Sequence, residues 1–102
     1  MAENAPHYRE RVETPEYQAQ FDMLADRYSA EMLENCLLGV LWGISTKPGA
    51  YPGLMGTMRM AKSESYSSEV PNFRIMFNLE PNGSVLMCWI EELGDGLMEH
   101  LT

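Results

Sequence analysis

Alternation of apolar and polar residues is clearest in the last third of the chain, where it predicts two strands joined by a tight turn. Apolar side chains occupy every second position at Phe73, Ile75, Phe77 and Leu79, and Met76 is the one apolar residue between them. This period of two is typical of a strand with one face in a core. The sequence Glu-Pro-Asn-Gly at 80–83 then supplies the residues of a turn. Residues 85–90 are apolar at every position and predict a second strand that is covered on both faces.

Apolar residues before residue 46 recur at intervals of three and four, which predicts two helices. Residues 14–16, Thr-Pro-Glu, combine a good N-cap, a proline suited to the first helical position and an acid at the positive end of the helix dipole. One helical stripe follows at Tyr17, Phe21, Leu24 and Tyr28. Ser29 can cap a second helix, so we expect an antiparallel helical hairpin, with one long kinked helix as the alternative. Residues 32–44 are apolar around most of the circumference and predict a central, buried helix, in which Gly39 and Gly43 let it approach the sheet closely.

The remaining segments complete an α+β domain. Residues 7–12 can form a short first strand, the two Pro-Gly pairs within 47–53 end the helices, and residues 54–62 form an extended segment followed by a polar connection. We therefore expect a short N-terminal strand, a helical hairpin and a three-stranded antiparallel meander, with the helices on one sheet face. At 102 residues the chain forms a single domain over 1–102, with a core from about 8 to 92 and flexible termini.

The acidic charge balance limits the functions that this domain can have. The formal net charge is −8, whereas proteins that hold phosphate backbones gain much of their affinity from Lys and Arg. Positive charge is concentrated in residues 47–74, which hold four basic and two acidic residues. Cys36 and Cys88 lie in apolar runs without metal-ligand spacing, which favours free thiols and a cytoplasmic location. The longest apolar run, 36–44, is too short to span a bilayer, so we expect no membrane role.

The order of elements and several short motifs resemble the RelE/ParE superfamily of bacterial type II toxin–antitoxin toxins. The matching segments are Thr-Pro-Glu-Tyr at 14–17, Pro48 after the helices, Leu-Met-Gly at 54–56 before a basic strand, and Phe-Arg-Ile-Met-Phe at 73–77 in place of the family's Tyr-Arg-Val strand. They extend over roughly residues 8–92. The resemblance implies a toxin component neutralised by a small protein antitoxin and, in its ribosome-dependent members, a metal-independent endoribonuclease that needs no cofactor.

The same resemblance identifies candidate catalytic residues. Arg74 matches the arginine of the family's strand, and Arg59 with Lys62 occupies the preceding basic strand. We expect the Arg59 and Arg74 side chains to meet on one surface, where cations could stabilise charge on a scissile phosphate. The match fails at residues 89–93, Trp-Ile-Glu-Glu-Leu, because such nucleases usually place Gly-His-Arg or Lys-Lys there. Carboxylates at that point oppose RNA binding, which disfavours ribonuclease activity and favours a ParE-like protein-binding mode.

Other candidate groups give a second hypothesis, a non-catalytic toxin-fold module for binding or dimerisation. Its partner surface consists of Met76, Met87 and Trp89, because methionine lines adaptable interfaces and an uncovered apolar strand favours association. A third hypothesis is an unrelated small α+β domain. No metal site is expected at the four acidic residues Glu91, Glu92, Asp95 and Glu99, since adjacent strand residues point to opposite faces and calcium-loop spacing is absent. We expect His7 and His100 to be solvated near the chain ends.

Overall fold

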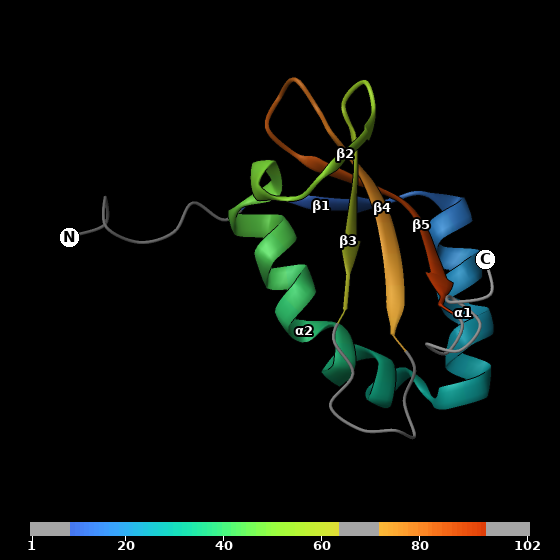
Figure 1. Cartoon of the computed structure of the whole chain (residues 1–102). Coiled ribbons are helices and arrows are strands. Elements are labelled where there is room, and N and C mark those ends of the chain that lie inside the picture. The colour runs from blue at the N-terminus through green and yellow to red at the C-terminus, as the bar shows by residue number, and fades with distance from the viewer. Residues whose placement is uncertain (1–8, 64–71, 94–102) are drawn as a thin grey trace, which may run out of the picture.

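A computed structural model describes residues 9–63 and 72–93 of the chain, which form two helices and a five-stranded mixed sheet (Figure 1). The elements in order are β1 (Arg11–Glu13), α1 (Pro15–Tyr28), α2 (Ala30–Thr46), the 3-10 turn η2 (Pro48–Ala50), β2 (Gly53–Met55), β3 (Met58–Lys62), β4 (Phe73–Leu79) and β5 (Val85–Glu92). The predicted α+β class and the antiparallel meander, formed by β3, β4 and β5, are confirmed.

The sheet has the strand order β1-β5-β4-β3-β2 and differs from the prediction in two places. The segment expected to be one strand over 54–62 is a hairpin, because Gly56 adopts a φ of +57° that turns β2 back onto β3. The first strand covers 11–13 among the described residues, and it pairs with β5 in parallel. The sheet is therefore mixed rather than antiparallel throughout.

Both predicted helix starts are confirmed. Thr14 Oγ1 accepts a hydrogen bond from the Tyr17 N–H at 3.1 Å, and it also donates to the Met87 carbonyl oxygen at 2.9 Å. Ser29, with a φ of +79°, ends α1 and caps α2 by accepting from the Met32 N–H at 3.2 Å. The helices consequently form a hairpin rather than one kinked helix, and the Thr14 side chain attaches the start of α1 to β5.

The core lies between the helices and one face of the sheet. Its buried side chains are Tyr17, Leu24, Leu33, Leu37, Ile44, Ala61, Phe73, Ile75, Phe77, Val85, Met87 and Ile90. The prediction that residues 32–44 form a central, buried helix is wrong, because α2 has an outer surface on which Leu38 remains 68% exposed. Only one stripe of α2 enters the core.

An irregularity in β5 decides which of its apolar residues enter that core. Val85 and Met87 are buried, but the next buried residue is Ile90, three positions later instead of two. The pairing register shifts opposite Met76 and Phe77, which is the signature of a β-bulge. The bulge turns Trp89 onto the sheet face away from α1 and α2, where it is half-buried, so among the described residues helices cover only one face of the last strand.

Candidate binding surface on the open sheet face

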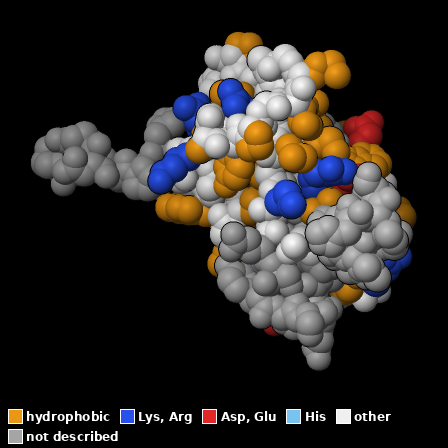
Figure 2. All heavy atoms as spheres, in the orientation of Figure 1, with side chains coloured by type: hydrophobic (Ala, Val, Ile, Leu, Met, Phe, Trp, Pro, Cys, Tyr) orange, Lys and Arg blue, Asp and Glu red, His pale blue; other side chains and the backbone are white. Residues whose placement is uncertain are grey.

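The side of the sheet away from the helices, here called the open face, presents three rows of side chains. Each row crosses β3, β4 and β5: an apolar row of Met60, Met76 and Trp89, a charged row of Lys62, Arg74 and Glu91, and a mixed row of Met58, Asn78 and Leu86. Residues directly opposite each other in antiparallel strands share a face, and the positions that alternate with these rows in β4 are buried against the helices. On the face seen in Figure 2, hydrophobic side chains lie among Lys and Arg over the strands, and few Asp or Glu side chains are visible.

The charged row contains a closed ion pair. Arg74 Nη2 donates to Glu91 Oε2, and Glu91 Oε1 accepts from Trp89 Nε1 at 2.9 Å. Partial burial of Glu91 acts to raise its pKa, but the hydrogen bonds from Arg74 and Trp89 and the Arg74 charge outweigh burial and hold that pKa below its ordinary value of 4.5. Glu91 is thus ionised at neutral pH and neutralises Arg74, while it also fixes the orientation of the indole ring.

Of the candidate catalytic residues, Lys62 and Arg74 lie directly opposite each other, but Arg59 lies on the other face of the sheet. Arg59 is paired with Phe77, whose side chain is fully buried against the helices. Its Nη1 donates to the Tyr51 carbonyl oxygen at 2.7 Å, which ties β3 to the loop before β2. The expectation that Arg59 and Arg74 meet on one surface is therefore wrong, and the described residues do not form the predicted three-cation site.

The candidate partner-binding residues also divide between the two faces. Met76 and Trp89 are opposite each other on the open face and half-buried, whereas Met87 is 1% exposed and packs in the core. Met87 cannot contact a partner in this fold. Met60 completes the apolar row but is not among the three predicted partner residues, although it alternates with Arg59 and Ala61 in the sequence.

The other polar groups in the described part of the chain do not form a catalytic arrangement either. Glu92 faces the helices, where it accepts from Tyr28 Oη at 2.8 Å and Arg27 Nη1 at 3.0 Å, so Glu91 and Glu92 do point to opposite faces as expected. Within residues 9–63 and 72–93, no group of three or more His, Cys, Asp or Glu side chains could hold a metal ion. Asp95, Glu99, His7 and His100 lie outside the described residues, and Cys36 and Cys88 are both free thiols.

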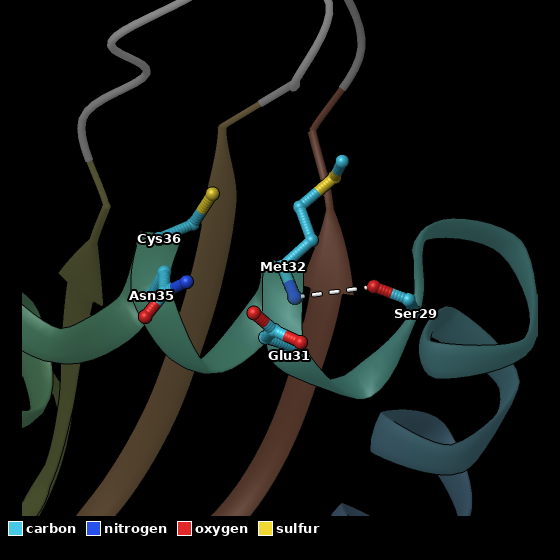
Figure 3. A pocket seen from close by; sticks show the side chains of 5 residues that line it. All are labelled: Ser29, Glu31, Met32, Asn35 and Cys36. Atoms are coloured by element: carbon cyan, nitrogen blue, oxygen red, sulfur yellow. Dashed lines mark hydrogen bonds between the residues drawn. The ribbon is translucent and has the colours of Figure 1, made fainter.

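A hollow of about 350 Å³ lies at the first turns of α2 (Figure 3). Its lining residues are Ser29, Glu31, Met32, Asn35 and Cys36. The Met32 and Cys36 side chains point the same way, while Ser29 turns toward the Met32 N–H that it caps. All five come from α2 and its cap, so no second described element encloses a ligand there.

No protein family model matches this sequence, and comparisons with curated proteins and with solved structures found no significant match. None of the helices in the described part of the chain is long and apolar enough to cross a membrane. The arguments about function therefore depend on the geometry of the open face.

Proposed function

We propose that this protein is a non-catalytic binding module that forms a homodimer through its open sheet face. The observation that supports this proposal is the apolar row of Met60, Met76 and Trp89, which crosses three strands on the face that neither α1 nor α2 covers. Methionine adapts to irregular partners, and tryptophan is among the residues that contribute most to binding energy at interfaces. The hydrogen bond from Trp89 to Glu91 restricts the indole before binding, which reduces the entropy lost on association.

The charged row favours a second copy of the chain as the partner. Its cation at the β3 end, Lys62, and its anion at the β5 end, Glu91, are separated by Arg74 in β4. A two-fold axis that lies between two stacked open faces and runs parallel to β4 would place Lys62 of each copy beside Glu91 of the other. Such reciprocal contacts are what a two-fold symmetric interface requires. The apolar rows of the two copies would then pack against each other.

A ribonuclease function has less support from the same geometry. Arg59 faces the helices, and Arg74 is neutralised by Glu91, so within the described residues Lys62 is the one cation of the charged row without an ion pair. A site for a scissile phosphate needs several convergent positive groups. The open face offers an interface with mixed charges instead.

Sedimentation equilibrium of the wild type and two lysine variants tests the proposal. We expect a wild-type dimer at or below about 100 µM, and a dissociation constant at least about tenfold higher for Lys62→Glu, which places like charges together. Lys47→Glu is the matched control, because Lys47 is also exposed and the charge change is the same, but it lies at the end of α2 away from the rows. A wild-type monomer at that concentration, or equal effects of the two variants, contradicts the proposal.

A second candidate is a RelE/ParE-like toxin that binds a target protein and is neutralised by an antitoxin. The observation in its favour is the element order of strand, helical hairpin and antiparallel meander. Expression of the wild type in bacteria should then arrest growth, and Trp89→Ala should relieve the arrest while the protein accumulates to the same level. Normal growth at high expression counts against this candidate and leaves the dimer proposal unaffected.

A further inference from the structure

The two edges of the sheet are protected to different degrees. At the β1 edge, the outward Arg9 N–H donates to the Ser45 carbonyl oxygen at 2.9 Å. The Arg11 guanidinium also donates to the Leu41 carbonyl oxygen at 3.0 Å and to Ser45 Oγ at 3.2 Å. The C-terminal half of α2 is thus attached to the chain immediately before β1 and to the side chain of its first residue. At the other edge, β2 pairs with β3 and with no other strand among the described residues.

The hydrogen-bond pattern identifies the backbone groups that β2 leaves free. The Met60 N–H donates to the Pro52 carbonyl oxygen at 3.0 Å, and Gly53 is the register partner of Arg59. In an antiparallel pair, the backbone N–H and C=O of successive residues point alternately toward the partner strand and away from it. Since the Pro52 carbonyl oxygen points toward β3, the N–H and C=O of Gly53 point to the outer edge. An exposed strand edge with such groups is a template for another extended chain.

The chemistry around this edge indicates what kind of chain it fits. Leu54 is 48% exposed and Met55 is 82% exposed, so apolar side chains of a partner strand would find contacts there. The described residues from 47 to 63 hold Lys47, Arg59 and Lys62 and no Asp or Glu, although the whole chain has a net charge of −8. Positive potential at one edge of an acidic protein attracts acidic partners and disfavours other acidic surfaces of the same chain.

We propose that the outer edge of β2 binds an extended segment of another protein in which acidic and apolar residues alternate, and that this segment joins the sheet as an additional strand. Main-chain hydrogen bonds to Gly53 hold the partner strand in place. The positive charges of Lys47 and Arg59 select an acidic sequence. This edge is distinct from the open face, so a dimer through Trp89 is not required for it.

A capped eight-residue peptide of alternating Glu and Val is the probe, and Gly53→Pro and Gly53→Ala are the matched variants. Proline removes the outward N–H of Gly53 and leaves the Met60 to Pro52 bond intact. Alanine keeps that N–H, and its Cβ would meet only the Met58 carbonyl oxygen at 3.9 Å, an ordinary contact. We expect the peptide to slow amide exchange at residues 53–57 of the wild type, and the dissociation constant to rise at least about tenfold in the proline variant and less than about threefold in the alanine variant.

Two further peptides complete the test. A Lys-Val counterpart should bind at least about tenfold more weakly at low salt, and a Glu-Val peptide with N-methyl groups along one edge should not protect residues 53–57. The N-methylated peptide gives the same information if Gly53→Pro fails to fold. Absence of protection at millimolar Glu-Val peptide, equal binding of the two charge types, or unchanged binding after N-methylation would overturn the proposal. Dimerisation measured in parallel should not respond to Gly53→Pro, which separates this inference from the proposed function.

Discussion

Gly39 and Gly43 in α2 have the same sequence context of small residues four positions apart, but the structure predicts opposite effects for their replacement by alanine. A Cβ at Gly39 would meet nothing within 4 Å. A Cβ at Gly43 would collide with the hydroxyl group of Tyr51. The expectation that both glycines let the helix approach the sheet is therefore wrong: Gly39 has no close neighbour, and Gly43 makes room for Tyr51 in the loop before β2.

The size of each effect can be worked out from these surroundings. Alanine at an exposed helix position stabilises by about 0.8–1 kcal/mol relative to glycine, and Gly39→Ala should gain this amount. Gly43→Ala gains the same helix preference but incurs overpacking, which typically costs about 1–3 kcal/mol. Tyr51 has little freedom to move, since its ring packs edge-on against Phe77 with centroids 5.8 Å apart and its carbonyl oxygen accepts from Arg59 at 2.7 Å. The net result for Gly43→Ala is a loss of up to about 2 kcal/mol.

Urea unfolding followed by far-ultraviolet circular dichroism measures the comparison directly. The two alanine variants should differ by about 1–3 kcal/mol in free energy of unfolding, with Gly39→Ala above and Gly43→Ala below the wild type. The double variant Gly43→Ala, Tyr51→Phe lacks the colliding hydroxyl and should recover part of the loss beyond additivity. Equal stability of Gly39→Ala and Gly43→Ala would refute the packing of Tyr51 over α2.

Three further predictions concern other contacts of the sheet. The folded-state pKa of Glu91 lies below its ordinary value, so its pairing with Arg74 stabilises the protein above pH 4.5, and this stabilisation is lost as the pH falls through the folded-state pKa. Glu91→Gln should therefore flatten the acid side of the profile of unfolding free energy against pH. The expected change is about 0.5–1 kcal/mol, because both side chains are about one-third exposed. Thr14→Ala should cost about 1–2 kcal/mol in urea unfolding and Thr14→Ser much less, because serine retains both the helix cap and the donor to Met87. Arg59→Met should lower stability without changing the sedimentation of the dimer, and a change in dimer affinity would contradict its placement on the helix side.

Much of the fold could be predicted because local signals agreed with tertiary packing. The Thr14 and Ser29 caps, the alternation in β4 and the Glu80–Gly83 turn, where the Gly83 N–H donates to the Glu80 carbonyl oxygen at 2.9 Å, all depend on neighbouring residues. The turn between β2 and β3 was not predicted, because Gly-Thr at 56–57 lies inside an otherwise extended pattern. The parallel pairing of β1 with β5 joins segments more than 70 residues apart, and a short strand contains no signal for its direction.

The outer surface of α2 illustrates a second limit of hydrophobic patterns. A helix with apolar residues on most sides is usually enclosed, and that reasoning predicted burial for residues 32–44. Burial instead depends on how many layers cover the helix, and α2 has the sheet on one side only. Composition gives the number of apolar residues but not the number of layers available to cover them.

The placement of Arg59 shows why the candidate site could not be obtained from the sequence of β3 alone. The alternation of residues in β3 allows two orientations: either Met58, Met60 and Lys62 face the core, or Arg59 and Ala61 do. Hydrophobicity favours burying the two methionines, but that register would also direct the Lys62 ammonium group into the core at a cost of several kcal/mol. The observed register buries Ala61 opposite Ile75, leaves Lys62 in solvent and allows the long Arg59 side chain to reach the Tyr51 carbonyl oxygen. A slip of one residue would bring Arg59 to the face of Arg74 only by reversing all of these positions, so the physical factors that stabilise the sheet also separate the two arginines.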